Sequence, residues 1–202
     1  YKATEVVNFS QGEIMMVGAY MHFFFLNQFI TLSGGLNAWV FLLAFIGSVI
    51  FSVLFGIILD FIINRPLKGE PVFSIIMATI SLAIILRSLT AMLAGPLSLI
   101  PISPFGDQTF VVSGIVISIL DLSIIFFAII MMLIFYYFFN YTKWGVAMKA
   151  TSADSEAAQL VGIPVNRVYR YVWIFASIVG VLSGIMLAPR MALMDTSMAY
   201  LG

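Results

Sequence analysis

The chain has 202 residues, of which 62% are hydrophobic and 9% charged, and its mean hydropathy is +1.13. Soluble proteins carry about 25% charged residues, so a water-soluble globular fold is excluded. Nine basic and nine acidic residues leave no net charge, and no basic stripe alternates with aromatic residues as a nucleic-acid surface requires. The absence of cysteine excludes disulfides, thiolate metal sites and cysteine nucleophiles.

Apolar stretches long enough to cross a bilayer, which takes about 20 residues, fill most of the chain. They predict five membrane spans, at 14–31, 38–59, 71–92, 121–141 and 170–189. We therefore predict an all-α fold, a polytopic integral membrane helical bundle in which residues 1–202 form a single transmembrane domain. The chain begins at Tyr1 and stops at Gly202 soon after a span, so we expect both ends to be cut from a larger protein with further spans.

The basic residues gather on one side of the membrane if these spans alternate in direction. That side holds seven of the nine: Lys2, Arg65, Lys68, Lys143, Lys149, Arg167 and Arg170. The positive-inside rule makes it the cytoplasmic side. Loops 64–70 and 142–168 are then cytoplasmic, whereas the turn at 33–37 and the Pro-, Gly- and Ser-rich segment 93–120 are extracytoplasmic.

The polar loop 142–168 contains a run with helical composition, 146–161, followed by the helix-stop residues Gly162 and Pro164. We predict one short amphipathic helix there. Its small apolar face comprises Val146, Ala150, Ala153 or Ala157, and Leu160 or Val161, while Lys149, Asp154 and Glu156 face water. Such a helix either joins two spans at the membrane interface or docks on another protein.

The sequence of this loop from Gly145 to Ile163, GVAMKATSADSEAAQLVGI, resembles the loop of branched-chain amino acid permeases of ATP-binding-cassette (ABC) importers. In that family G-x-A-M-R-A, a following Asp and A-x-L-x-G-I recur; Lys149 stands here in place of the Arg. The resemblance implies a coupling helix that docks in a cleft of an ATPase subunit. The ATPase-coupling residues carried over are Gly145, Ala147, Met148, Lys149, Ala150, Asp154, Ala158, Leu160, Gly162 and Ile163.

A second motif, NFSQGEIMMVGAY at 8–20, resembles N-F-x-x-G-E-x-x-M-x-G-A-Y, with which the second span of the same family begins. The residues alone allow two interpretations. In one, Ser10 and Glu13 form a capping box at a helix start. In the other, the helix starts inside the membrane interior and its positive dipole end faces the carboxylate of a zwitterionic substrate. The substrate path then includes Asn8, Gln11, Gly12, Glu13 and Gly18.

Small residues recur at every fourth position of the fifth span: Ala176, Gly180, Gly184 and Ala188. Such a stripe lets helix backbones approach closely in lipid. It packs against another span of the same chain, which we expect, or forms the interface of a subunit dimer.

Few other polar residues stand in apolar surroundings. Arg87 lies toward the outer end of the third span and Asp121 opens the fourth. We expect Arg87 to snorkel to the outer interface and Asp121 to cap its helix, an ion pair between them being the alternative. His22 is the only histidine, and a single imidazole without clustered carboxylates is a poor metal site. We expect it to have a hydrogen-bonded packing role, and we expect no metal.

The sequence contains no phosphate-binding loop G-x-x-x-x-G-K-[ST], so we expect ATP to be bound by partner subunits and no cofactor in this chain. No nucleophile with a base, no paired carboxylates and no H-E-x-x-H motif indicate an enzyme. Ionisable residues near the middle of the spans are nearly absent, which argues against an ion-coupled secondary transporter, the alternative from another class.

The resemblance implies the membrane-spanning permease subunit of an ABC importer for branched-chain amino acids, working by alternating access. A permease of the same family for urea or short-chain amides is the nearer alternative. The partners implied are a second homologous permease subunit, two cytoplasmic ABC ATPases and an extracytoplasmic solute-binding protein. The location implied is the lipid bilayer of a bacterial-type plasma (inner) membrane, with no nucleic-acid partner.

Overall fold

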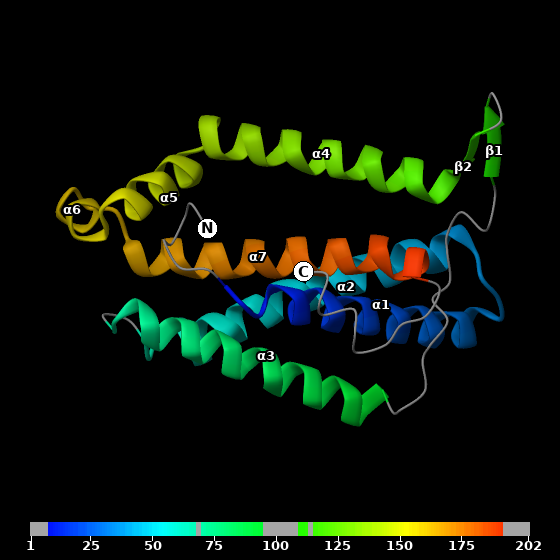
Figure 1. Ribbon diagram of the computed structural model, residues 1–202, viewed down its shortest axis with the longest axis horizontal. Coiled ribbons are helices and arrows are strands. Elements are labelled where there is room, and N and C mark those ends of the chain that lie inside the picture. The colour runs from blue at the N-terminus through cyan, green and yellow to red at the C-terminus, as the bar shows by residue number, and fades with distance from the viewer. Residues whose placement is uncertain (1–7, 68–69, 95–108, 113–114, 192–202) are drawn as a thin grey trace.

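The computed structural model describes residues 8–67, 70–94, 109–112 and 115–191 (Figure 1). Within them the chain forms an all-helical bundle with one small hairpin. The α-helices are α1 Gln11–Ser33, α2 Ala38–Leu59, α3 Val72–Ala94, α4 Ile119–Tyr141, α5 Lys143–Ala153, α6 Ser155–Leu160 and α7 Val165–Leu187. A π-helix, η1 Asp60–Asn64, extends α2, and a 3-10 turn, η2 Ala188–Met191, extends α7.

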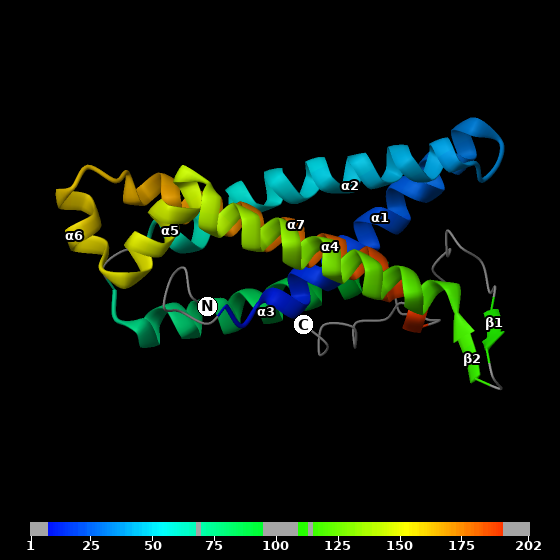
Figure 2. The same cartoon turned by 90° about the horizontal axis from the view of Figure 1, so that it is seen from above.

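Five of these helices are long and apolar enough to cross a membrane, which confirms the predicted all-α bundle and its five spans. They are α1, α2 with η1, α3, α4, and α7 with the start of η2. The turn predicted at 33–37 is present, because α1 ends at Gly34, which adopts a φ of +74°. Figure 2 shows the short helices α5 and α6 at one end of the bundle and the strands at the other. We call these the loop end and the hairpin end.

A two-stranded antiparallel hairpin lies within the predicted outer connection 93–120, where no strand was predicted. Strands β1 Thr109–Val112 and β2 Ile115–Ser118 pair in register, with Thr109 opposite Ser118 and Val112 opposite Ile115. Both strands are rich in β-branched residues, which favour extended backbone. Residues 95–108 of the same connection lie outside the described residues.

The core of the bundle consists of α1, α2 and α7, which contact one another through small residues. Along α2 the buried residues include Ala44, Ser48, Ser52 and Gly56, spaced by one helical turn. At Gly56 an added Cβ would lie 2.7 Å from the Cα of Ile174 in α7. Side chains larger than these would hold the two helices apart.

The small residues of α7 face α1. The side-chain amide of Gln11 donates to the carbonyl of Ala176 at 3.1 Å. An added Cβ at Gly180 would lie 2.8 Å from Ile14, and one at Gly184 would overlap the carbonyl oxygen of Met15. Ala188 is buried in an apolar cluster with two residues of α1, Met16 and Ala19. This face of α7 is therefore occupied by α1 of the same chain.

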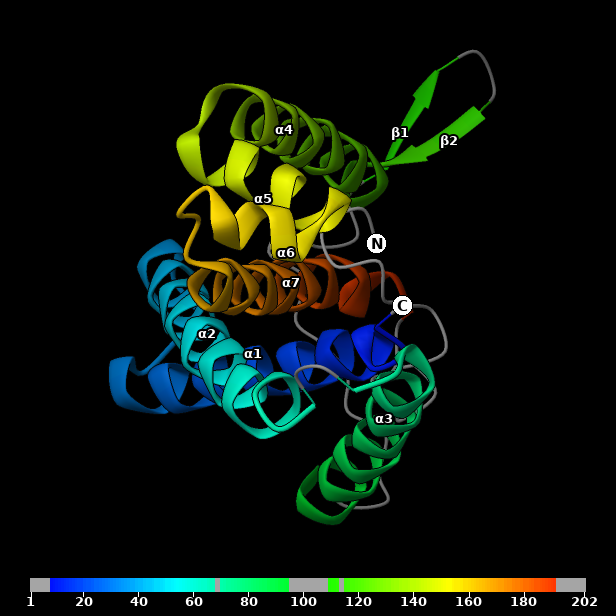
Figure 3. The ribbon, with the colours of Figure 1, turned by 90° about the vertical axis from the view of Figure 1, so that its left-hand side faces the viewer.

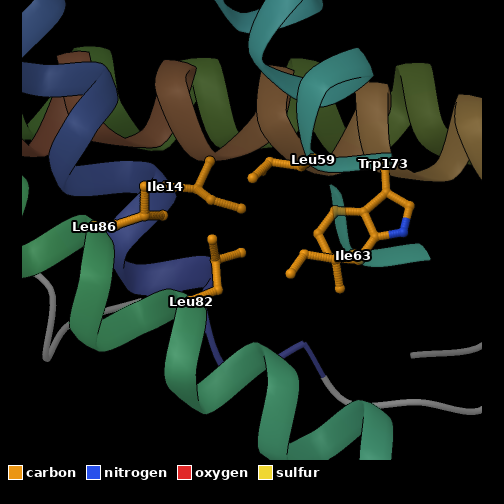
Figure 4. Packing of buried hydrophobic residues seen from close by; sticks show 6 residues of the cluster. All are labelled: Ile14, Leu59, Ile63, Leu82, Leu86 and Trp173. Atoms are coloured by element: carbon orange, nitrogen blue, oxygen red, sulfur yellow. The ribbon is translucent and has the colours of Figure 1, made fainter. Parts of the chain in front are cut away.

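The outer spans α3 and α4 lie on opposite sides of this core (Figure 3). Leu82 and Leu86 of α3 join Ile14 of α1, Leu59 of α2, Ile63 of η1 and Trp173 of α7 in an apolar cluster (Figure 4). Helix α4 is the least buried span, with 6% of its apolar window covered, against 22% for α3 and 44% for α7. The outer spans are thus more loosely attached than the core helices.

The α1–α7 contact leads to a stability prediction. The substitution Gly184→Ala places a methyl group against the Met15 carbonyl, so the helices must separate, at a cost of about 1–3 kcal/mol. We expect the midpoint of thermal unfolding of the detergent-purified protein to fall by several degrees. Gly35→Ala is the control, because an added Cβ there meets nothing within 4 Å. Equal midpoints for the two variants would contradict the packing described here.

Candidate functional site

Helix α1 begins deep inside the bundle, midway along α7 (Figure 1). Its first residue, Gln11, bonds to the carbonyl of Ala176, which lies halfway along α7. Ser10, the residue before the helix, is fully buried. The predicted start of a helix within the membrane interior therefore matches where α1 begins, although the motif alone could not decide between that and a capping role.

The predicted capping box is wrong. Ser10 makes no side-chain bond to the first turn of α1; its hydroxyl donates to the Oδ1 atom of Asn8 at 2.7 Å instead. Glu13 does not turn back to cap the helix, because its carboxylate pairs with Arg87 of α3. A charged partner gives the stronger bond, since hydrogen bonds between two ionised groups are about twice as strong as neutral ones.

The Glu13–Arg87 pair is a polar contact between α1 and α3. The Nη2 atom of Arg87 lies 2.5 Å from the Oε1 atom of Glu13. The Glu13 side chain is 5% exposed, whereas that of Arg87 is 32% exposed. Ile14 and Leu86, the chain neighbours of the two charged residues, belong to the apolar cluster of Figure 4, so the pair lies beside that cluster.

Arg87 and Asp121 therefore both have roles other than those predicted. Arg87 does not snorkel alone to the interface, and Asp121 pairs with Arg190 at 2.8 Å. Nor does Asp121 cap α4, because the Ser118 hydroxyl accepts the N–H of Leu120 at the start of that helix. Sequence spacing missed the true partners because Glu13 and Arg87 are 74 residues apart.

The residues predicted for the substrate path separate into two groups. Asn8, Gln11, Gly12 and Glu13 gather where α1 begins. Gly18 lies further along α1, where an added Cβ would be 2.5 Å from the Cα of Val181 in α7. The structure thus gives Gly18 a packing contact with α7, and the polar group lies at the start of the helix.

The predicted single helix in loop 142–168 is wrong, because the structure contains two helices, α5 and α6. They meet at Asp154, whose backbone is extended and whose carboxylate accepts the N–H groups of Glu156 and Ala157, both at 2.9 Å. Aspartate favours this capping bond over continuing a helix. The helical composition of the run concealed the break.

The end of α6 has the geometry that its sequence predicts. Gly162 adopts a φ of +87°, which an L residue with a side chain rarely takes. The N–H of Ile163 donates to the carbonyl of Ala158 at 3.0 Å, and that of Gly162 to Gln159 at 3.1 Å. These bonds close the last turn of the helix as glycine-terminated helices commonly do.

The predicted apolar face of this loop is not buried within the chain. The buried residues are Gly145, Met148, Thr151 and Ala158. The break at Asp154 interrupts the helical repeat from which that face was predicted. Val146, Leu160 and Val161 are 55%, 89% and 77% exposed. Of the other coupling residues, Ala147, Ala150 and Ile163 are partly buried, while Lys149 and Asp154 are exposed.

The loop is fixed to both spans that flank it. At Gly145 an added Cβ would overlap the carbonyl of Phe138 in α4, so glycine permits the tight α4–α5 turn. Lys149 donates to the Oδ1 atom of Asn140 at 2.8 Å. On the other side, the rings of Trp144 and Tyr171 pack edge to face with centroids 4.5 Å apart. Helix α5, from which α6 continues, is therefore held against both α4 and α7.

A buried carboxylate also lies at the loop end. Asp60, in η1, is 1% exposed and lies 3.4 Å from Arg170 of α7 and 3.6 Å from Arg65. The side-chain amide of Asn64 donates to it at 2.8 Å. The sequence signal for this contact was an acidic residue at the end of one apolar span and an arginine at the start of another.

Metal binding finds no support in the described part of the chain, where no three His, Asp or Glu residues gather. His22 has the predicted packing role: its Nδ1 atom hydrogen-bonds to the Ser48 hydroxyl at 3.1 Å, and its ring packs against Phe41.

Comparison with known proteins agrees with this architecture. Residues 1–200 match the family described as "Branched-chain amino acid transport system / permease component". The permease protein LivH of a high-affinity branched-chain amino acid transport system in Salmonella typhimurium is 23% identical over 192 residues, which are 93% of this chain and 62% of LivH. The corresponding BraD of Pseudomonas aeruginosa is 24% identical over 207 residues, 100% of this chain and 67% of BraD.

The chain thus spans about two thirds of the length of these relatives, being 62% of LivH and 67% of BraD. No solved structure matches it. The family model covers almost the whole chain, and five helices can span a membrane. The chain therefore belongs to the branched-chain amino acid ABC transport permease family, as a multi-pass membrane protein and not an enzyme.

Proposed function

We propose that this chain is the membrane-spanning permease subunit of an ABC importer for branched-chain amino acids. Substrate moves by alternating access, and ATP binding at partner subunits drives the change. The observation that carries the proposal is that apolar side chains are exposed to solvent at α6, in the loop between α4 and α7. Family membership and the names of the relatives support the cargo.

The loop is proposed as the coupling element that docks on an ATPase. Leu160 is 89% exposed and Val161 77%, although both are apolar and lie on a polar loop. Burying a leucine in a partner surface gains about 1.5–3 kcal/mol. Ala158, at 4% exposed, faces inward and supports the loop, so the docking contact falls on its neighbours.

The loop end is proposed to be cytoplasmic. Arg65, Lys143, Lys149, Arg167 and Arg170 belong to segments of that end, whereas Arg190 follows α7 at the hairpin end. This distribution supports the positive-inside assignment. Lys2 and Lys68, which the sequence places on the same side, lie outside the described residues.

The proposed assembly contains a second homologous permease subunit, two cytoplasmic ABC ATPases and an extracytoplasmic solute-binding protein, in a bacterial plasma (inner) membrane. ATP is bound by the ATPases. Urea or a short-chain amide is the alternative cargo within the same family. Ion-coupled secondary transport is disfavoured, because a single charged pair, Glu13 with Arg87, lies near mid-bundle among the described residues.

Transport by the complete protein tests this function. It is reconstituted in liposomes with its partner subunits, ATP inside and the binding protein outside, and uptake of labelled leucine and labelled urea is measured. We expect leucine uptake that requires both ATP and the binding protein. Urea uptake alone would contradict the cargo, and leucine uptake without ATP would contradict the class of transporter.

A charge at the tip of α6 tests the coupling role. Leu160→Asp removes the apolar contact, and we expect ATPase association and uptake to fall about 10- to 100-fold, equivalent to the 1.5–3 kcal/mol of a buried leucine. Thermal stability should not change, since Leu160 is almost fully exposed. Gln159→Asp is the control, with the same charge on the neighbouring exposed residue. Normal ATPase copurification with Leu160→Asp would refute the assignment.

A further inference from the structure

We propose that the Glu13–Arg87 ion pair is the point in the membrane at which the permease binds its zwitterionic substrate. An amino acid entering the seam between α1 and α3 separates the two side chains, with its carboxylate on Arg87 and its ammonium group on Glu13. This inference rests on the proposed function, because it requires an amino acid as cargo.

The position of the pair is the first argument. Glu13 lies in the first turn of α1, and α1 begins beside the middle of α7. Charged side chains are expensive at that depth, and buried ion pairs are often no more stabilising than apolar residues of similar size. A pair kept there at that cost is better explained by binding than by stability.

The exposure of the pair is the second argument. The Glu13 side chain is 5% exposed, but one third of the Arg87 side chain, 32%, is uncovered. A guanidinium at this depth does not face hydrocarbon without a large penalty. The Nε atom of Arg87 is buried, so the uncovered part lies elsewhere on the side chain; we expect it to face water or a polar solute and to provide access to the pair.

A zwitterion can compensate the charges of both Glu13 and Arg87 when their ion pair opens. Opening the pair by itself leaves two ions in a medium of low dielectric constant, each without its counter-charge. A zwitterion supplies one counter-charge to each ion, so no charge is left uncompensated during the exchange. Urea and neutral amides supply none. The pair therefore selects amino acids over the alternative cargo of the same family.

The contact between α1 and α3 that holds the pair can open with little loss of packing. Helix α3 has 22% of its apolar window buried, half the value for α7, and contacts chiefly α1 and η1. Ile14 and Leu86, the chain neighbours of the two charged residues, belong with Leu82 to the apolar cluster of Figure 4. These apolar side chains would contact the branched side chain of the substrate once its charged groups are bound.

Two double variants distinguish a substrate-binding pair from one that only holds α1 to α3. Glu13→Gln with Arg87→Gln keeps size and hydrogen bonding but removes both charges. Glu13→Arg with Arg87→Glu restores an ion pair of opposite polarity, which can still hold α1 to α3 but presents each charge to the wrong end of the substrate. Asp121→Asn with Arg190→Gln is the matched control, because that pair lies exposed at the hairpin end.

Each variant is made in the complete transporter, and assembly, thermal stability, ATP hydrolysis and leucine uptake are measured. We expect both Glu13–Arg87 variants to assemble and hydrolyse ATP while leucine uptake falls at least tenfold, and the control to transport as the wild type does. Two results would overturn the proposal: leucine uptake within twofold of wild type in the reversed pair, or failure of both variants to assemble. Either would show that the pair only holds α1 to α3.

The wild-type protein separates this inference from the proposed function. If the wild type does not import leucine with ATP and the binding protein, the proposed function fails before any variant is compared. If it imports leucine and the reversed pair does so equally, the function stands and the binding role of the ion pair fails. Import of urea alone overturns both.

Discussion

The close backbone approach of α1 and α7 determines where every other functional group lies. Gly184 meets the Met15 carbonyl, and Gly18 meets the backbone of Val181. These contacts fix how far α1 extends along α7 and so place its first turn halfway along the bundle. In a membrane, where lipid tails are as apolar as leucine, such tight contact between small residues is a main source of helix association.

Because α1 starts at that depth, Glu13 is brought into the membrane interior without a charged neighbour on its own helix. Its carboxylate must then find a partner on another span, and Arg87 of α3 provides it. The ion pair and the apolar cluster around Ile14 and Leu86 together attach α3 to the core. Apart from these contacts α3 is sparsely packed, with 22% of its apolar window buried.

The sequence predicts the spans and their order well, because hydropathy and length are local properties. It also predicts the stop at Gly162, since the helix end needs a residue that tolerates positive φ. It fails where partners are distant in the chain. Glu13 had a plausible local partner in Ser10, and Arg87 in Asp121, yet both pair elsewhere because helix packing brings closer charges to them.

The loop between α4 and α7 was predicted less well, for a different reason. Residues 146–161 have helical composition throughout, but Asp154 offers its carboxylate to two backbone N–H groups and so starts a new helix. Such a cap stabilises the start of a helix by about 1 kcal/mol. This is comparable with the helix propensity of the few residues that would otherwise continue α5. The apolar face predicted from a continuous repeat was lost at that point.

Packed helices join two of the charged contacts of the bundle, Asp60–Arg170 and Glu13–Arg87. Helix α6 is separated from α7 by only the turn at 161–164, and Arg170 near the start of α7 bonds to Asp60 of η1. Further along, α7 packs on the first turns of α1, which carry Glu13. Helices in direct contact thus connect α6 with the Glu13–Arg87 pair. If the pair binds substrate, the energy source acts at the start of α7 and the cargo beside its middle.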